Sequence, residues 1–186
     1  MNLKNTVDRY GSLSIAMHWL ILLLLVAVYA AIELRGNFPK GSGLREGLKQ
    51  WHFMLGLTVF ALVWLRLALR LWGPTPRILP APGVWQHRAA ALMHLALYLF
   101  LVGMPLLGWL VLSAKGKAIP FFGLELPALI GPDKVLAESI EEIHVTIGTV
   151  GYYLVGLHAA AALLHHYALH DNALLRMLPR RRARLH

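Results

Sequence analysis

Histidines within apolar sequence are the residues of this chain whose chemistry stands out. The segment 143–169 contains four histidines but no acid, lysine or arginine, and it exceeds the roughly 20 residues that cross a bilayer. His144 and His158 lie fourteen positions apart, which in a helix is about 21 Å along the axis and within about 40° of the same face. An ionisable ring in lipid is costly and usually faces the interior of a bundle, where it marks a pathway or a bound partner. Two such rings at opposite depths predict two stacked cofactors.

The cofactor that best fits paired imidazoles in a membrane is b-type haem. Its iron binds neutral imidazole, and its flat apolar macrocycle fits between helices. The chain has no cysteine, which excludes disulfides, thiolate-held iron–sulfur clusters and covalently attached c-type haem. A haem must therefore be held by side-chain ligation and packing. The sequence contains no recognisable arrangement of nucleophile and base, phosphate-binding loop or carboxylate pair, so the expected chemistry is electron transfer.

The composition is that of a membrane protein. Hydrophobic residues make up 58% of the 186 residues and charged residues only 15%, which lies outside the range of soluble proteins. The formal net charge of +9 would suit a nucleic acid partner in a soluble protein, but here the basic residues flank apolar segments. Membrane topology and contact with lipid explain the charge better, and no nucleic acid partner is expected.

Four apolar segments predict four membrane-spanning helices, at residues 12–34, 50–72, 89–113 and 139–169. The first follows basic residues, as the apolar part of a signal peptide does, but it is too long and lacks a persuasive cleavage site, so we interpret it as an uncleaved span. Glycines and prolines predict loops at 35–49 and 114–137, and the second loop can contain a short surface helix. The predicted fold is an all-α membrane protein, a four-transmembrane-helix bundle in a single integral membrane domain (1–186) with a tail at 170–186.

Basic residues near the span ends predict the orientation, because they are enriched on the cytoplasmic side of a membrane. One side carries eleven basic residues against two acids, and the other carries seven against seven. The eleven are Lys4, Arg9, Arg66, Arg70, Arg77, Arg88, Arg176, Arg180, Arg181, Arg182 and Arg184. Both termini are therefore expected to be cytoplasmic, which agrees with an even number of spans.

The orientation assigns each intramembrane histidine to a depth. His52 and His144 lie near the outer ends of their spans and form the one possible outer pair. His158 lies near an inner end, where either His18 or His94 can be its partner. Four ligands at two levels fit two haems b with two histidine ligands each, and the residues alone leave the inner partner open.

Two glycines are candidates for contact with the cofactors. Gly56 and Gly148 lie four residues after His52 and His144, so each leaves bare backbone one turn away on the same face as the histidine. A porphyrin plane can lie against such a gap. The simpler interpretation is that small residues let membrane helices approach one another closely.

Further polar residues near the inner level have several possible roles. If His94 is not a ligand, it can hydrogen-bond a haem propionate, line a quinone site or contact a neighbouring helix. Arg66 and Arg70 can bind the inner haem propionates, although contact with lipid headgroups is the simpler explanation. His165 and His166 are predicted at the inner interface, where a polar ring needs no functional reason.

Several motifs are distinctive in combination. They are Ser14-Ile15-Ala16-Met17-His18-Trp19, Arg35-Gly36 with Phe38-Pro39, Arg66-Leu67 with Arg70-Leu71, Gly156-Leu157-His158, His165-His166-Tyr167 and Asp171-Asn172-Ala173-Leu174-Leu175-Arg176-Met177. Together they resemble the bacterial cytochrome b561 family over nearly the whole chain, with residues 115–138 the least distinctive. The family consists of four-helix, inner-membrane cytochromes with two haems. The resemblance implies that His52 and His144 hold the outer iron and that His18 and His158 hold the inner one.

The resemblance also implies an activity. Similar proteins act as superoxide oxidases, which take electrons from superoxide at the periplasmic face and give them to ubiquinone. The expected partners are therefore superoxide, the ubiquinone pool and the lipid bilayer, with no obligate protein partner. A local basic patch would concentrate the superoxide anion, and its candidates are Arg35, Lys40, Arg45, Lys49, Lys115 and Lys117. The outer side also carries seven acids, so its formal charge is balanced overall. A role in keeping the loops soluble explains each of these basic residues equally well.

Two other functions are compatible with the same pattern. A cytochrome subunit for a periplasmic dehydrogenase would use the same histidines but require a protein partner. A haem-free cation transporter would use the histidine ladder as its path. Intramembrane acids would favour the transporter, but Glu33, Glu138, Glu141 and Glu142 lie at the outer ends of the predicted spans.

Overall fold

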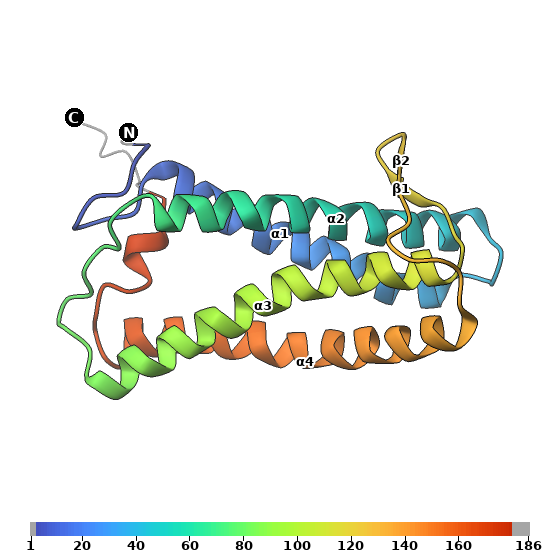
Figure 1. Cartoon of the computed structure of the whole chain (residues 1–186). Coiled ribbons are helices and arrows are strands. Elements are labelled where there is room, and N and C mark those ends of the chain that lie inside the picture. Colours follow the sequence, from blue (N-terminus) through green and yellow to red (C-terminus); the bar gives the residue numbers. More distant parts are fainter. Residues whose placement is uncertain (1–2, 180–186) are drawn as a thin grey trace, which may run out of the picture.

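The computed structural model describes residues 3–179 and consists mainly of four long helices (Figure 1). In chain order the elements are α1 (Ser12–Leu34), the 3-10 helix η1 (Arg35–Asn37), α2 (Gly43–Leu71), α3 (Val84–Ala114), β1 (Ile119–Phe121), β2 (Leu124–Leu126), α4 (Lys134–Tyr167) and the 3-10 helix η2 (Leu175–Met177). All four long helices are long and apolar enough to cross a membrane. The predicted all-α membrane fold with four spanning helices is confirmed.

Three of the helices begin earlier than the apolar segments do, because polar residues cap them. Ser42 caps α2 by accepting a hydrogen bond from the Arg45 amide, so residues 43–49, predicted as loop, are helical. Asp133 caps α4 in the same way through the Leu136 amide. At α3 the Gln86 side chain accepts a hydrogen bond from the Gly83 amide. Hydropathy identifies the length that suits a membrane, whereas the caps decide where each helix starts.

The segment between α3 and α4 is not a plain loop, which corrects the prediction for residues 114–137. Strands β1 and β2 form an antiparallel hairpin in which Ile119 pairs with Leu126. The turn places Phe122 and Gly123 at positive φ. Ile119 is almost fully buried against Leu57 and Leu112, so the hairpin packs onto α2 and α3. We call this end of the bundle the hairpin end.

The helices are arranged so that α1 packs on α2, α2 on α3 and α3 on α4, and all four run along one long axis (Figure 1). The helices α1 and α4 do not form a comparably close pair, and side chains bridge them. The Tyr29 hydroxyl donates to the Gly148 carbonyl at 2.7 Å, and the Tyr29 and Tyr152 rings stack at 4.2 Å. The bundle is therefore tightly packed on one side and joined by side chains on the other.

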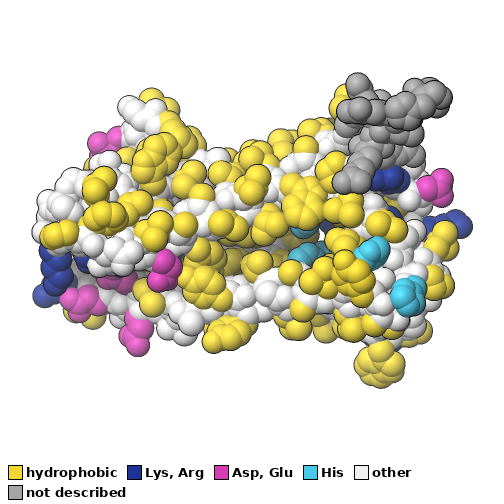
Figure 2. Space-filling view, turned by 180° about the vertical axis from the view of Figure 1, so that it is seen from behind, with side chains coloured by type: hydrophobic (Ala, Val, Ile, Leu, Met, Phe, Trp, Pro, Cys, Tyr) yellow, Lys and Arg dark blue, Asp and Glu magenta, His cyan; other side chains and the backbone are white. Residues whose placement is uncertain are grey.

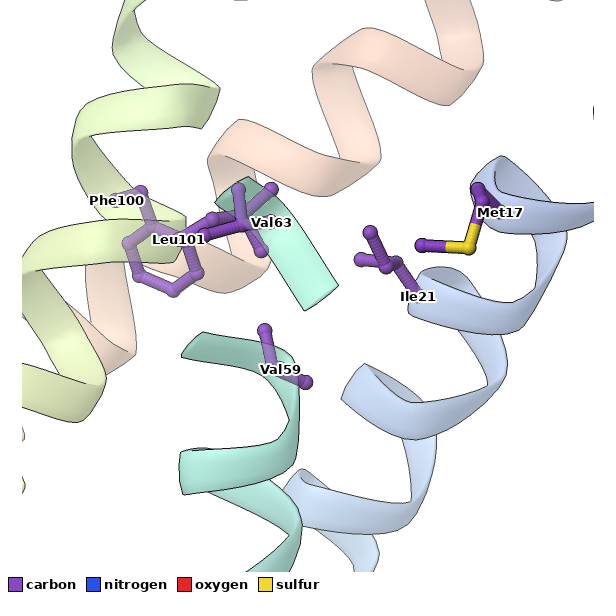
Figure 3. Packing of buried hydrophobic residues seen from close by; sticks show 6 residues of the cluster. All are labelled: Met17, Ile21, Val59, Val63, Phe100 and Leu101. Atoms are coloured by element: carbon purple, nitrogen blue, oxygen red, sulfur yellow. The ribbon is translucent and has the colours of Figure 1, made fainter. Parts of the chain in front are cut away.

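The main apolar core lies where α1, α2 and α3 meet (Figure 3). It consists of Met17, Ile21, Val59, Val63, Phe100 and Leu101, and Figure 3 shows the α2 and α3 side chains converging on one another. Val59 and Val63 are only 2% and 1% exposed. Many other large apolar side chains are exposed, as expected where lipid is the solvent.

The described chain ends, Leu3 and Pro179, meet at the opposite end of the bundle, which we call the terminal end. Arg9 donates to the Leu178 carbonyl at 2.7 Å, and the Trp19 indole donates to the Met177 carbonyl at 2.8 Å. Arg176 is buried, donates to the Pro76 carbonyl and stacks on Tyr10. Burial lowers the pKa of Arg176, while Tyr10 and Asp171 act in the opposite direction. The arginine cluster at 180–184 lies outside the described residues.

Arg176 ties three distant segments together, so its removal should destabilise the fold. We expect Arg176→Ala to lower the free energy of unfolding by about 2 kcal/mol, because the buried Pro76 carbonyl loses a charged donor. Thermal unfolding in detergent measures the effect. Arg77→Ala is the matched control, because the Arg77 side chain is exposed and should change the melting temperature little. Equal melting temperatures for the two variants would contradict the prediction.

Candidate functional site

Two imidazole rings face each other near the hairpin end. His52 on α2 and His144 on α4 have ring centroids 6.2 Å apart and planes inclined at 80°. Nδ1 of His52 lies 3.0 Å from the Val28 carbonyl on α1, an acceptor, so this nitrogen carries the proton and donates. The other nitrogen, Nε2, is then the one that can bind a metal. We call these residues the hairpin-end pair.

The backbone of α3 comes close to the His144 ring at Gly108. A Cβ atom built on Gly108 would lie 3.3 Å from Cε1 of His144, so only glycine leaves the ring unhindered space. The Met104 carbonyl is also near this ring, yet the buried Nδ1 atom of His144 has no well-formed hydrogen bond among the described residues. A buried imidazole nitrogen that the protein leaves unsatisfied is unusual and fits a ring reserved for another partner.

Three rings meet near the terminal end. His158 on α4 has its centroid 6.2 Å from that of His18 on α1, with planes inclined at 78°. His94 on α3 is also close, with its centroid 5.7 Å from that of His158 and an inclination of 72°. His94 donates from Nδ1 to the Ala90 carbonyl at 2.6 Å, and the Trp19 ring packs edge-on to His18. We call His18, His94 and His158 the terminal-end group.

Both ring pairs suit the axial ligation of one iron. A metal–imidazole bond is about 2 Å long and each ring centroid lies roughly 1 Å behind its nitrogen, so two rings on opposite sides of one metal have centroids about 6 Å apart. The 6.2 Å separations of the hairpin-end pair and of His18 with His158 agree with this value. Within residues 3–179 no group of three or more such side chains is arranged to hold a metal ion by itself, whereas a haem iron needs only two because its porphyrin supplies the other ligands.

Open space accompanies the histidines. A Cβ atom built on Gly56 would meet nothing within 4 Å, and one on Gly148 would meet only the end of Met104 at 3.4 Å. Figure 2 shows a long hollow between the helices, with histidine side chains in and beside it toward the terminal end. Space is therefore open beside Gly56, and beside Gly148 only the end of the flexible Met104 side chain is close.

Two arginines of α2 lie beside the terminal-end group. Arg66 is within electrostatic range of His18 and His158, and Arg70 is within range of His94. Both side chains are half-buried. Their positive charge suits an acidic group on a ligand held by these histidines.

The basic residues predicted at the outer side all lie at the hairpin end, but most of the half-buried ones have partners. Arg45 donates to the Arg35 and Phe38 carbonyls. Lys49 pairs with Glu46 at 2.7 Å, and Lys115 pairs with Glu141 at 2.6 Å. Within the described part of the chain, Lys40 and Lys117 are exposed and form no ion pair. These two lysines are the cations best placed to act on a soluble anion.

The remaining histidines have local roles or are exposed. His165 pairs with buried Asp171 at 2.5 Å, and its neighbour His166 packs edge-on against Tyr167. His87 and His170 are exposed. His186 lies outside the described residues. None of these four described rings is brought to the hairpin-end pair or the terminal-end group.

Comparison with known proteins identifies the family. A model of the family described as prokaryotic cytochrome b561 matches residues 9–180. The chain is 40% identical over 176 residues to cytochrome b561 homolog 1 of Escherichia coli (strain K12), covering 95% of this chain and 100% of that protein. The chain belongs to the prokaryotic cytochrome b561 family.

Two further relatives support this membership. One, from Yersinia pestis, is named probable superoxide oxidase CybB and is 37% identical over 174 residues, which cover 94% of this chain and 98% of the relative. Cytochrome b561 homolog 2 of Escherichia coli (strain K12) is 30% identical over 179 residues, covering 96% and 95%. The family consists of membrane electron-transfer proteins that bind b-type haem. The predicted family is confirmed, and the haem-free cation transporter does not fit it.

Sequence reasoning missed the residues that shape the space around the histidines. Gly108 lies on a different helix from the ring that it accommodates, so no spacing along the chain points to it. The positions of Tyr29 and Gly151 beside this space were also not predicted. Gly151 had a signal, because it lies seven residues from both His144 and His158, halfway between two rings on one face of α4.

We propose that His18, and not His94, is the partner of His158, because His18 repeats the geometry of the hairpin-end pair. A His18→Ala variant should lose one bound haem, whereas His94→Ala should keep it. A pyridine haemochrome assay counts the haem, and electron paramagnetic resonance detects the loss of a low-spin iron with two imidazole ligands. His87→Ala, an exposed site, is the control. Haem loss in His94→Ala with retention in His18→Ala would reverse the assignment.

Proposed function

We propose that this protein is a di-haem b cytochrome that transfers electrons from superoxide to ubiquinone, as a superoxide oxidase. His52 and His144 hold one haem iron, and His18 and His158 hold the other. The single observation that carries the proposal is the occurrence of two ring pairs at opposite ends of the bundle with the same 6.2 Å separation and nearly the same inclination. The name of the Yersinia pestis relative supports the choice of superoxide as electron donor.

We place the hairpin end at the periplasmic face of a bacterial inner membrane and both termini in the cytoplasm. The support is the distribution of charge, since eleven of the basic residues near the span ends belong to the terminal side. Superoxide formed outside the cytoplasm then meets the hairpin-end pair first. Ubiquinone reaches the protein from the surrounding lipid.

The haem supplies reversible one-electron oxidation and reduction when it is bound. If two histidines held each iron, superoxide would give up its electron without binding the metal. Two superoxide anions give up two electrons and leave as dioxygen. One ubiquinone takes up these two electrons and two protons and becomes ubiquinol. The protein sets the potentials through its ligands, their burial and their hydrogen bonds, such as the one from His52 to Val28.

Arg66 and Arg70 act on the haem held by His18 and His158. Their charges lie within electrostatic range of the terminal-end group, which suits ion pairs with propionates. Gly56 and Gly148 leave the space in which the porphyrin held by the hairpin-end pair can lie. His94 remains near the second haem as a hydrogen-bonding group without ligating it.

Removal of a ligand at the hairpin end tests this function. His52→Ala should halve the haem content and abolish the reduction of ubiquinone by enzymatically generated superoxide, because the entry point for electrons is lost. Haem content and quinol formation are measured in the same preparation, with His87→Ala as the control. Full activity in a His52→Ala protein that keeps only one haem would show that electrons do not enter at this site.

Lys40 and Lys117 should raise the local concentration of the superoxide anion. Reversing both charges, in Lys40→Glu with Lys117→Glu, should lower the rate at limiting superoxide by roughly twofold to tenfold at low ionic strength. The effect should shrink at about 1 M salt, where the screening length is only about 3 Å. Arg77→Glu, which reverses an exposed charge at the terminal end, is the control. A rate independent of both charge and salt would contradict this role.

A second candidate is a cytochrome subunit that accepts electrons from a periplasmic dehydrogenase. The tip of the hairpin favours it, because Phe122 and Leu124 are 54% and 67% exposed where a protein partner can contact them. Such a subunit should copurify with its dehydrogenase and react poorly with superoxide alone. Rapid reduction of the isolated protein by superoxide would exclude this alternative.

A further inference from the structure

Gly151 lies midway between the two histidine levels on α4. It lies seven residues from His144 and seven from His158, which is about 10 Å along the axis and within about 20° of the same face in each direction. Gly151 is also buried, although most residues around it on α4 are exposed. The residue midway between the two histidine levels therefore has no side chain, although glycine has a low helix propensity.

Two aromatic side chains occupy the space that a Gly151 side chain would take. A Cβ atom built there would lie 2.4 Å from Cζ of Phe100 on α3 and 2.4 Å from the hydroxyl oxygen of Tyr29 on α1. No real Cβ atom approaches so closely. Phe100 and Tyr29 thus reach α4 from two other helices and fill its inner face between His144 and His158.

Hydrogen bonding and stacking hold Tyr29 in this position. Its hydroxyl donates to the Gly148 carbonyl at 2.7 Å, and its ring stacks on that of Tyr152 at 4.2 Å. Tyr152 in turn donates to Glu33 at 2.8 Å. Tyr29 lies eleven residues after His18, which is about 16 Å along α1 and within about 20° of the same face. Tyr29 therefore lies on the same face of α1 as His18 but nearer the hairpin end.

Phe100 is held by the apolar core. It is 8% exposed and belongs to the same cluster as Val59 and Val63 of α2 (Figure 3). Val59 lies seven residues after His52 and on nearly the same face of α2, so the core layer also falls between the histidine levels on that helix. We call Tyr29, Val59, Phe100 and Gly151 the central partition.

We propose that the central partition holds the two haem sites apart and fixes their distance and relative orientation. This inference rests on the proposed function, since it requires a haem at each histidine level. Side chains of α1, α2 and α3 fill the bundle between the levels and meet the bare backbone of α4 at Gly151, so a flat ligand beside either pair stops at this layer. An electron that passes from one site to the other crosses the same layer, mostly through the aromatic groups.

Size changes at this contact test the proposal. Phe100→Leu shortens the partition without adding charge. Gly151→Ala inserts a methyl group where Phe100 and Tyr29 lie. A triple variant, Gly151→Ala with Tyr29→Phe and Phe100→Leu, removes the Tyr29 hydroxyl and the Phe100 ring atoms that conflict with this methyl group. Gly156→Ala is the control on α4, because its Cβ would meet nothing within 4 Å and it faces away from His158. All variants are purified as the full chain in detergent with bound haem.

Circular dichroism in the Soret band depends directly on the distance and relative orientation of two haems, because their coupled electronic transitions produce a paired signal. Phe100→Leu should keep about two haems per chain and shift the paired signal and the midpoint potentials. Gly151→Ala should lose haem or lose the wild-type signal, the triple variant should recover haem binding, and Gly156→Ala should match the wild type.

Specific outcomes would overturn the proposal. A wild-type Soret signal and unchanged potentials in Phe100→Leu and Gly151→Ala, with both haems present, would show that the partition does not set the geometry. Failure of the triple variant to recover any haem lost in Gly151→Ala would show that the close contact is not the cause. A wild-type protein with a single haem and no paired signal would instead refute the proposed function on which the inference rests.

Discussion

An imidazole within a bilayer must find its partners inside the protein, because lipid tails offer no hydrogen bonds. In this bundle that requirement turns the rings of four spanning helices inward and decides how closely the helices can approach. At Gly108 the backbone of α3 comes close to the His144 ring, which only glycine permits without crowding. On the open side, α1 and α4 stay apart and are joined by the Tyr29 side chain. At Gly108 the spacing of the helices thus matches the space that the His144 ring occupies.

The bundle combines two kinds of interior. Its middle layer is tightly packed, with Val59 and Val63 almost fully buried. Nearer the hairpin end, the open space beside Gly56 contrasts with this packing. Dense packing holds the helices in register, and that register keeps His52 opposite His144 across the bundle. If the bundle holds planar ligands at two depths, as proposed above, this firm layer would lie between them.

The sequence predicted the features that depend on spacing along a single helix. The fourteen residues from His144 to His158 placed two rings at two depths, and hydropathy gave α1 its observed bounds. Features that depend on contacts between helices were beyond such reasoning. His94 and His18 are both near His158, and spacing along the chain could not rank them, so that only the resemblance to the family favoured His18. The β1–β2 hairpin was also missed, because proline and glycine mark turns whether or not short strands pair between them.

The contact between Trp19 and Met177 has a consequence for how the protein is made. The ribosome synthesises Trp19 long before Met177, so their hydrogen bond can form only after α4 has emerged. Because Trp19 also packs against His18, the surroundings of that ring stay incomplete throughout membrane insertion. The surroundings of His18 in α1 are therefore complete only after the segment that contains Met177 has been synthesised and has folded back onto Trp19.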